Sequence, residues 1–149
     1  YHVLLTSAGG GYSRWQEVSL TRWRADTTLD NWGSWLYIQV EDSSALWSAG
    51  YQPTGALPES QRVLFHPHMV EFHRRDHDIA LTMEITVAPD DDVEIRLVTL
   101  TNESERPRRL LERGGSLGGS NCAAVIGPSL SAAARSTALR SARTLPGHG

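Results

Sequence analysis

Hydrophobic and polar residues alternate with a period of two along much of the first 112 residues, a pattern typical of strands with one buried face. The clearest run covers 79–87, where Ile, Leu, Met, Ile and Val occupy every second position. Residues 36–40 alternate in the same way. Both runs predict strands that lay one apolar face on a core.

A third run begins at residue 93 and predicts another strand. Here Val93, Ile95 and Leu97 form the apolar face, and Glu94 and Arg96 form the polar face. After Leu97 the alternation slips by one position, which predicts either burial on both faces or a β-bulge.

Shorter runs of the same kind are separated by turn-forming residues, and no stretch before Leu111 repeats with the period of about 3.6 that marks a helix. Many short strands without crossover helices predict an all-β, antiparallel β-sandwich. The shorter strands are expected at 2–6, 18–24, 46–48, 62–65 and 70–73, and the turns at 9–11, 30–31, 41–43, 53–55, 66–68, 76–78 and 89–92.

Charge and cysteine usage narrow the class of protein. Fourteen basic residues, all Arg, stand against seventeen acidic ones, and a net charge of −3 is too mild for a nucleic-acid partner. The single cysteine, Cys122, has no partner for an intramolecular disulfide. No apolar run reaches the roughly 18 residues of a spanning helix. We therefore expect a soluble domain, with the cytoplasmic side preferred, and the start at Tyr1 predicts a fragment of a longer protein.

The composition changes abruptly near Leu111. All acidic residues lie at or before Glu112, the last aromatic residue is Phe72, and Gly, Ser, Ala and Arg dominate thereafter. We predict a folded domain over 1–111 and a low-complexity tail over 112–149 that is irregular or weakly helical. Three interpretations of the tail stay open: a flexible linker, a weak amphipathic helix over 130–143, and a reading-frame error or cloning artefact.

Several features that resemble chemical motifs predict no chemistry. The glycines at 9–11 precede no helix and no Lys, so they indicate a tight turn or a close approach to a ligand, not a phosphate loop. His66, His68, His73 and His77 lack a recognised metal spacing. The aspartates at 90–92 are adjacent, so they cannot face each other across a glycosidic bond. We predict no catalytic residue, no metal and no cofactor.

Aromatic and arginine side chains are concentrated in the N-terminal third of the chain. Ring faces beside guanidinium donors suit a sugar, which offers both C–H faces and hydroxyls. The alternative is that most of the tryptophans are core residues of a small sandwich. The set is Tyr12, Trp15, Trp23, Trp32, Trp35, Tyr37, Trp47 and Tyr51, interleaved with Arg14, Arg22 and Arg24.

The order of several motifs carries a family resemblance. Ser-Ala-Gly-Gly-Gly-Tyr-Ser-Arg-Trp at 7–15, Leu-Thr-Arg-Trp-Arg at 20–24, Asp-Asn-Trp-Gly at 30–33 and Trp-Ser-Ala-Gly-Tyr-Gln-Pro at 47–53 follow one another. Together they resemble the N-terminal sandwich domain of glycoside hydrolase family 94, formerly glycosyltransferase family 36. The family contains cellobiose and chitobiose phosphorylases and the phosphorylase-like region of cyclic β-1,2-glucan synthases, and residues 47–55 look most like the synthase branch.

The resemblance, which covers about 1–111, implies a fold and a division of labour. It implies a large antiparallel sandwich of the mutarotase-like supersandwich kind, preceding a separate (α/α)₆ barrel that holds the Asp general acid and the phosphate site. The chain alone is therefore expected to be inactive, although the parent enzyme would be a glycosyltransferase or glycoside phosphorylase. Since the chain departs from the family pattern after Arg109, the sandwich is expected to be incomplete.

The resemblance also implies partners and site residues. The expected partners are a carbohydrate, the catalytic barrel and a second copy of the chain in a homodimer. The carbohydrate would be a β-glucan or a glucoside. The resemblance is also compatible with a parent protein that associates with a membrane. Two alternatives stay open: a free-standing carbohydrate-binding module, and a ligand-free scaffold or dimerisation domain. The candidate carbohydrate contacts, of which the first four are expected on a loop, are Tyr12, Ser13, Arg14, Trp15, Arg22, Trp23 and Arg24.

Overall fold

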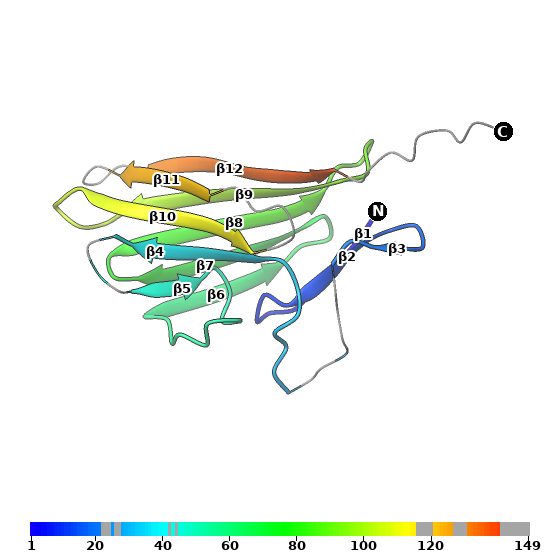
Figure 1. Cartoon of the computed structure of the whole chain (residues 1–149), viewed down its shortest axis with the longest axis horizontal. Coiled ribbons are helices and arrows are strands. Elements are labelled where there is room, and N and C mark those ends of the chain that lie inside the picture. Colours follow the sequence, from blue (N-terminus) through cyan, green and yellow to red (C-terminus); the bar gives the residue numbers. More distant parts are fainter. Residues whose placement is uncertain are drawn as a thin grey trace.

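The computed structural model describes residues 1–21, 25, 28–41, 43, 45–115, 121–126 and 131–140, and after residue 111 only the course of the backbone. Two larger sheets lie over one another, with a small sheet at one end (Figure 1). Each strand pairing is antiparallel, which confirms the predicted sandwich. None of the described segments is a helix long and apolar enough to cross a bilayer.

Within the described residues, twelve strands make up three sheets. The small sheet contains β1 (His2–Leu5), β2 (Gly11–Trp15) and β3 (Val18–Ser19) in that order. The four-stranded sheet has the order β11 (Asn121–Ile126), β10 (Arg108–Gly115), β4 (Trp35–Val40) and β5 (Leu46–Ser48). The five-stranded sheet has the order β12 (Ser131–Arg140), β9 (Val93–Asn102), β8 (Ile79–Val87), β7 (Met69–Asp76) and β6 (Ser60–Phe65).

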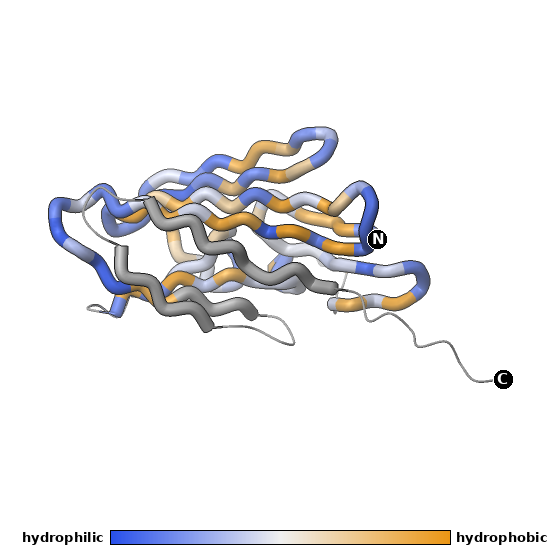
Figure 2. The backbone as a smooth tube through the Cα atoms, turned by 90° about the horizontal axis from the view of Figure 1, so that it is seen from above, coloured by the Kyte–Doolittle hydropathy of each residue, from blue (hydrophilic) through white to orange (hydrophobic). Residues whose placement is uncertain are grey.

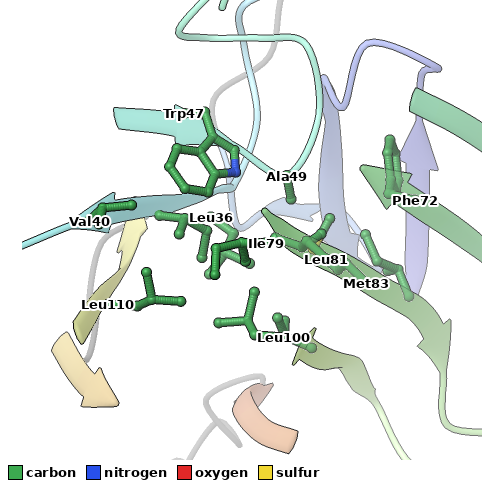
Figure 3. Packing of buried hydrophobic residues seen from close by; sticks show 13 residues of the cluster. Leu36, Val40, Trp47, Ala49, Phe72, Ile79, Leu81, Met83, Leu100 and Leu110 are labelled. Carbon is green, nitrogen blue, oxygen red and sulfur yellow. The ribbon is translucent and has the colours of Figure 1, made fainter. Parts of the chain in front are cut away.

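The core lies between the two larger sheets, where the period-two pattern of the sequence places it (Figure 3). Hydropathy accordingly alternates along the backbone of the strands (Figure 2). β8 buries every second residue from Ile79 to Ile85, as its alternation predicts. Trp47 is buried, so for this tryptophan the core interpretation is confirmed. The buried apolar residues are Leu36, Ile38, Val40, Trp47, Ala49, Phe72, Ile79, Leu81, Met83, Ile85, Val98, Leu100 and Leu110.

The predicted faces of β9 are wrong at its beginning. Glu94 is buried, whereas Ile95 is 42% exposed. The inward set continues through Val98 and Leu100 with no register shift against β8, so the break in apolar alternation is not a bulge between these strands. The physical reason is that Glu94 and Arg96 form an ion pair, which makes their burial tolerable.

The prediction of an irregular or weakly helical tail is wrong for the parts of 112–149 that the structure describes. β10 continues to Gly115, β11 pairs with β10, and β12 pairs with β9. A strand at a sheet edge is held by backbone hydrogen bonds, which do not need the large apolar side chains that this tail lacks. The rest of the tail, including residues 130 and 141–143 of the proposed helix, lies outside the described residues.

Candidate functional site

The first four candidate sugar contacts lie on a strand and not on the expected loop. Tyr12, Ser13, Arg14 and Trp15 form most of β2. Because side chains alternate along a strand, Ser13 and Trp15 point to one side while Tyr12 and Arg14 point to the other. The four side chains therefore cannot form a single binding surface.

Arg22, Trp23 and Arg24 complete the predicted set. They lie outside the described residues, so their part in the candidate site stays a prediction.

Ser13 and Trp15 face the large sheet and attach the small sheet to it. The hydroxyl of Ser13, which is buried, donates a hydrogen bond to Oε2 of Glu94. The indole N–H of Trp15 donates to Oδ2 of Asp92 over 2.6 Å. Both acceptors lie at or just before the start of β9, so these two side chains act in the docking of β2.

Tyr12 and Arg14 lie on the opposite side of β2. Arg14 forms an ion pair with Glu17, at 2.5 Å between nitrogen and oxygen, and its side chain is 40% exposed. Tyr12 is half-buried and pairs with Leu4 of β1 across the strand register. Of the four residues, Tyr12 is the one that lines a groove.

The triple glycine closes a tight junction between distant segments. Gly9 has a φ of +96°, and Gly50 packs so closely against the preceding turn that a Cβ there would lie 2.5 Å from the carbonyl oxygen of Ala8. That oxygen also accepts a hydrogen bond from the N–H of Gln52 over 2.9 Å. The tight-turn interpretation of the glycines is thus supported, and this junction fixes the β1–β2 turn to the loop after β5.

An open groove of about 920 Å³ is lined by the small sheet and by one end of the five-stranded sheet. Its volume lies within the range of about 300–1,000 Å³ that is common for small-ligand sites. Its lining comes from β1 and β2, from the β6–β7 hairpin and from the end of β8. The lining residues are His2, Val3, Leu4, Leu5, Tyr12, Phe65, His66, Pro67, His68, Met69, Val70, Ile85, Thr86, Val87 and Pro89.

The lining of the groove combines ring faces with a few polar groups. Phe65, at the end of β6, is 57% exposed, and Tyr12 brings a second ring from β2. His66 and His68 flank Pro67 in the turn, with their ring centroids 6.3 Å apart. Apolar surface with scattered hydrogen-bonding tips is what a sugar ring requires.

The carboxylate of Glu71 lies beside the turn between β6 and β7, which contains His66 and His68. Glu71 on β7 accepts from Nε2 of His73 at 2.8 Å, and its other oxygen lies 3.3 Å from Nε2 of His66. The hydrogen bond from His73, with smaller contributions from His66 and Arg62, holds the pKa of Glu71 below its ordinary value. The charged form of Glu71 is therefore the form that this turn favours.

The four clustered histidines are spread over different environments. His66 and His68 belong to the groove, His73 lies on β7, and the ring of His77 packs against buried Trp47 at 5.5 Å. Within the described ranges, no group of three or more His, Cys, Asp or Glu side chains is arranged to hold a metal ion.

Sequence reasoning missed Phe65, Met69 and Val87 as groove residues. Nothing in their local pattern distinguishes them from ordinary strand residues. The groove exists because β1 and β2 lie beside the end of a sheet about 60 residues further along the chain, and a periodicity cannot report that. The one available signal was Pro67 between two histidines, which marks an exposed hairpin turn.

The arrangement defines a class of protein: an antiparallel β-sandwich extended by a small N-terminal sheet, without a helix in the described residues. The chain belongs to the family of the glycosyl hydrolase 94 supersandwich domain, whose family model matches residues 1–111.

Characterised relatives share this region. A cyclic β-(1,2)-glucan synthase, NdvB of Rhizobium meliloti (strain 1021), is 33% identical over 108 residues, which cover 72% of this chain and 4% of that protein. An N,N'-diacetylchitobiose phosphorylase of Vibrio proteolyticus is 27% identical over 113 residues, which cover 72% of this chain and 14% of the enzyme. A 3-O-β-D-glucopyranosyl-β-D-glucuronide phosphorylase of Paenibacillus borealis is 30% identical over 98 residues, 61% of this chain and 13% of the enzyme.

The chain thus spans between 4% and 14% of the length of these relatives. What unites them is carbohydrate chemistry, and what this chain shares with them is the sandwich.

Proposed function

We propose that this chain is the non-catalytic N-terminal sandwich domain of an enzyme related to cyclic β-1,2-glucan synthases and inverting disaccharide phosphorylases. In this proposal it contacts carbohydrate and supports a separate helical barrel that carries out catalysis. The family assignment and the sugar-processing relatives support the class of parent. Their much greater length supports a catalytic partner elsewhere in the parent protein.

The observation that carries the carbohydrate proposal is the position of Tyr12 in the groove. It is the sequence-predicted sugar contact that lines the open groove, together with the exposed ring of Phe65. Two aromatic rings in one groove can stack on the C–H faces of a sugar, while the imidazoles of the β6–β7 turn offer hydrogen bonds to its hydroxyls.

The test is a titration of this chain with sophorose, a β-1,2-linked glucose disaccharide, and with N,N'-diacetylchitobiose, followed by amide chemical shifts. Shifts should concentrate at β1, β2 and the β6–β7 turn. Tyr12→Ala should weaken binding about tenfold through the lost ring contact. Tyr51→Ala is the matched control, because Tyr51 is an exposed tyrosine that does not line the groove.

Two outcomes would overturn the carbohydrate proposal. One is that the wild-type chain binds neither of the two disaccharides at millimolar concentration. The other is an equal loss of affinity in Tyr12→Ala and Tyr51→Ala. In the intact parent protein, Tyr12→Ala should raise KM for the glucan more than it lowers kcat, since the residue would bind substrate away from the reacting bond.

A further inference from the structure

A buried carboxylate connects β9 to β2, directly beside the groove. The side chain of Glu94 is fully buried, and three polar groups lie around its carboxylate. Ser13 donates its hydroxyl to Oε2, Nε of Arg96 donates to Oε1 over 2.6 Å, and the Tyr1 hydroxyl lies 3.5 Å from Oε2.

The partner cation is itself fixed. Arg96 is 11% exposed, and its NH1 donates to the backbone carbonyl of Ser34 over 2.9 Å. One guanidinium therefore joins the carboxylate to the segment that enters β4. Because a buried carboxylate is costly unless fully paired, Glu94 has a stable position only when Arg96 and Ser13 are both in place.

Apolar residues could fill the same space and hold the small sheet by packing alone. Apolar contacts would still form if β2 shifted along β9. A hydrogen bond from Ser13 to a buried carboxylate forms at one position of β2 only. A polar group at this point thus selects the register in which β2 lies against β9.

Tyr12 is the residue next to Ser13 and points to the other side of β2. When Ser13 is held by Glu94, the backbone of Tyr12 is held as well, and the side chain faces the groove. We propose that Glu94, together with Ser13, is a positioning residue: it places the ring of Tyr12 in the wall of the sugar groove. This inference rests on the proposed function of the groove, and it assigns Glu94 no contact with ligand.

Two variants test the inference, with one control. Ser13→Ala removes the donated hydrogen bond, and Glu94→Gln keeps the shape of the side chain but removes its charge. Glu103→Gln is the control, because Glu103 is an exposed carboxylate just after the opposite end of β9 that pairs with Arg75. Residue-resolved amide exchange should accelerate about tenfold or more across β2 in the first two variants, with β8 unchanged.

Affinity for sophorose separates positioning from general damage. Ser13→Ala should weaken binding about tenfold in the wild-type background and by no further factor in a Tyr12→Ala background, because its effect passes through Tyr12. A loss of equal size in both backgrounds would overturn the inference. So would unchanged amide exchange in β2.

The amide-exchange measurement needs no sugar, which keeps the two proposals distinguishable. If the wild-type chain binds no disaccharide, the proposed function of the groove fails. Local loosening of β2 in Ser13→Ala would then still support Glu94 as the residue that positions Tyr12, and its absence would still overturn that role.

Discussion

Arg74 and Asp76 lie two residues apart on β7, and their side chains form an ion pair inside the protein, with 2.5 Å between Nε and Oδ2. The two remaining nitrogens of the guanidinium donate to the backbone carbonyls of Gly50 and Ala56, over 2.8 and 2.9 Å. A single side chain therefore satisfies a buried carboxylate and holds two points of the loop between β5 and β6.

Arg74→Ala should lower the free energy of unfolding by about 3–5 kcal/mol, because it leaves Asp76 as an unpaired buried charge. Arg75→Ala is the matched control. Arg75 is the neighbouring residue, but it pairs with Glu59, Asp78 and Glu103 at the surface, so its loss should cost far less than the loss of Arg74. Urea unfolding of both variants measures the difference, and equal midpoints would contradict this assignment.

Phe72→Ala should destabilise the fold by about 3–5 kcal/mol, since Phe72 is fully buried between the sheets and its removal leaves a cavity. Phe65→Ala removes the same ring from the wall of the groove, where it is 57% exposed, and should cost about 1 kcal/mol or less. Thermal unfolding distinguishes the two. A larger loss in Phe65→Ala would mean that the groove is closed in solution.

Gly50→Ala should destabilise by about 3 kcal/mol, because the added methyl group would meet the backbone of Ala8 and Gly9. Gly55→Ala provides the comparison within the same loop. Gly55 has a φ of +62° and open space around it, so the substitution carries only the backbone penalty of about 1 kcal/mol. Chemical denaturation that ranks Gly55→Ala as the more damaging change would show that the junction yields easily.

Acid should weaken the fold partly through Glu71. The pKa of Glu71 is lowered in the folded state, so its contribution is present above the unfolded pKa of about 4.3 and is lost as the pH falls through the folded value. Thermal unfolding between about pH 6 and pH 3 should show the advantage of wild type over Glu71→Gln shrinking with falling pH.

The charged groups around Glu71 determine which further variants that experiment needs. Arg62 of β6, His66 of the turn and His73 of β7 lower its pKa, and Glu84 of β8 lies opposite it in the register. His73→Ala should reduce the same acid-dependent contribution, since it removes the largest cause of the shift. Glu105→Gln, in the exposed loop after β9, controls for the loss of one negative charge. A constant difference between wild type and Glu71→Gln across the range would refute the prediction.

The purified chain should release no glucose 1-phosphate from sophorose and phosphate. In the proposed function the carboxyl acid that protonates the glycosidic oxygen belongs to the barrel, and hydrolysis or phosphorolysis of such a bond requires that acid. An enzymatic assay for glucose 1-phosphate checks this, with the intact parent protein as positive control. Turnover by the chain alone that survives repeated purification would contradict it.

The sequence was informative where a strand separates core from solvent. β8 and β4 follow their alternation, because each has apolar side chains on one face and polar ones on the other. The hairpin turn at His77 and Asp78 was also predicted, from the turn-forming residues at 76–78, and both residues adopt the positive φ values that suit a tight turn.

β9 shows why the same rule can fail. Its alternation predicted that Ile95 faces the core, but Glu94 and Arg96 face inward and neutralise each other. A pattern of hydrophobicity treats each charge as exposed, and it has no means of recognising two charges that are partners. The groove could not be predicted from the sequence for a related reason, because it is lined by segments that are distant in sequence.

The hydrogen bond between Ser13 and Glu94 joins residues 81 positions apart. During synthesis the small N-terminal sheet leaves the ribosome long before its acceptor on β9 exists. At about 5–20 residues per second, the delay is roughly 4 to 16 s. For that time Ser13 and Trp15 lack the carboxylates to which they donate in the folded domain, and a molecular chaperone that recognises exposed aromatic strands would find its target there.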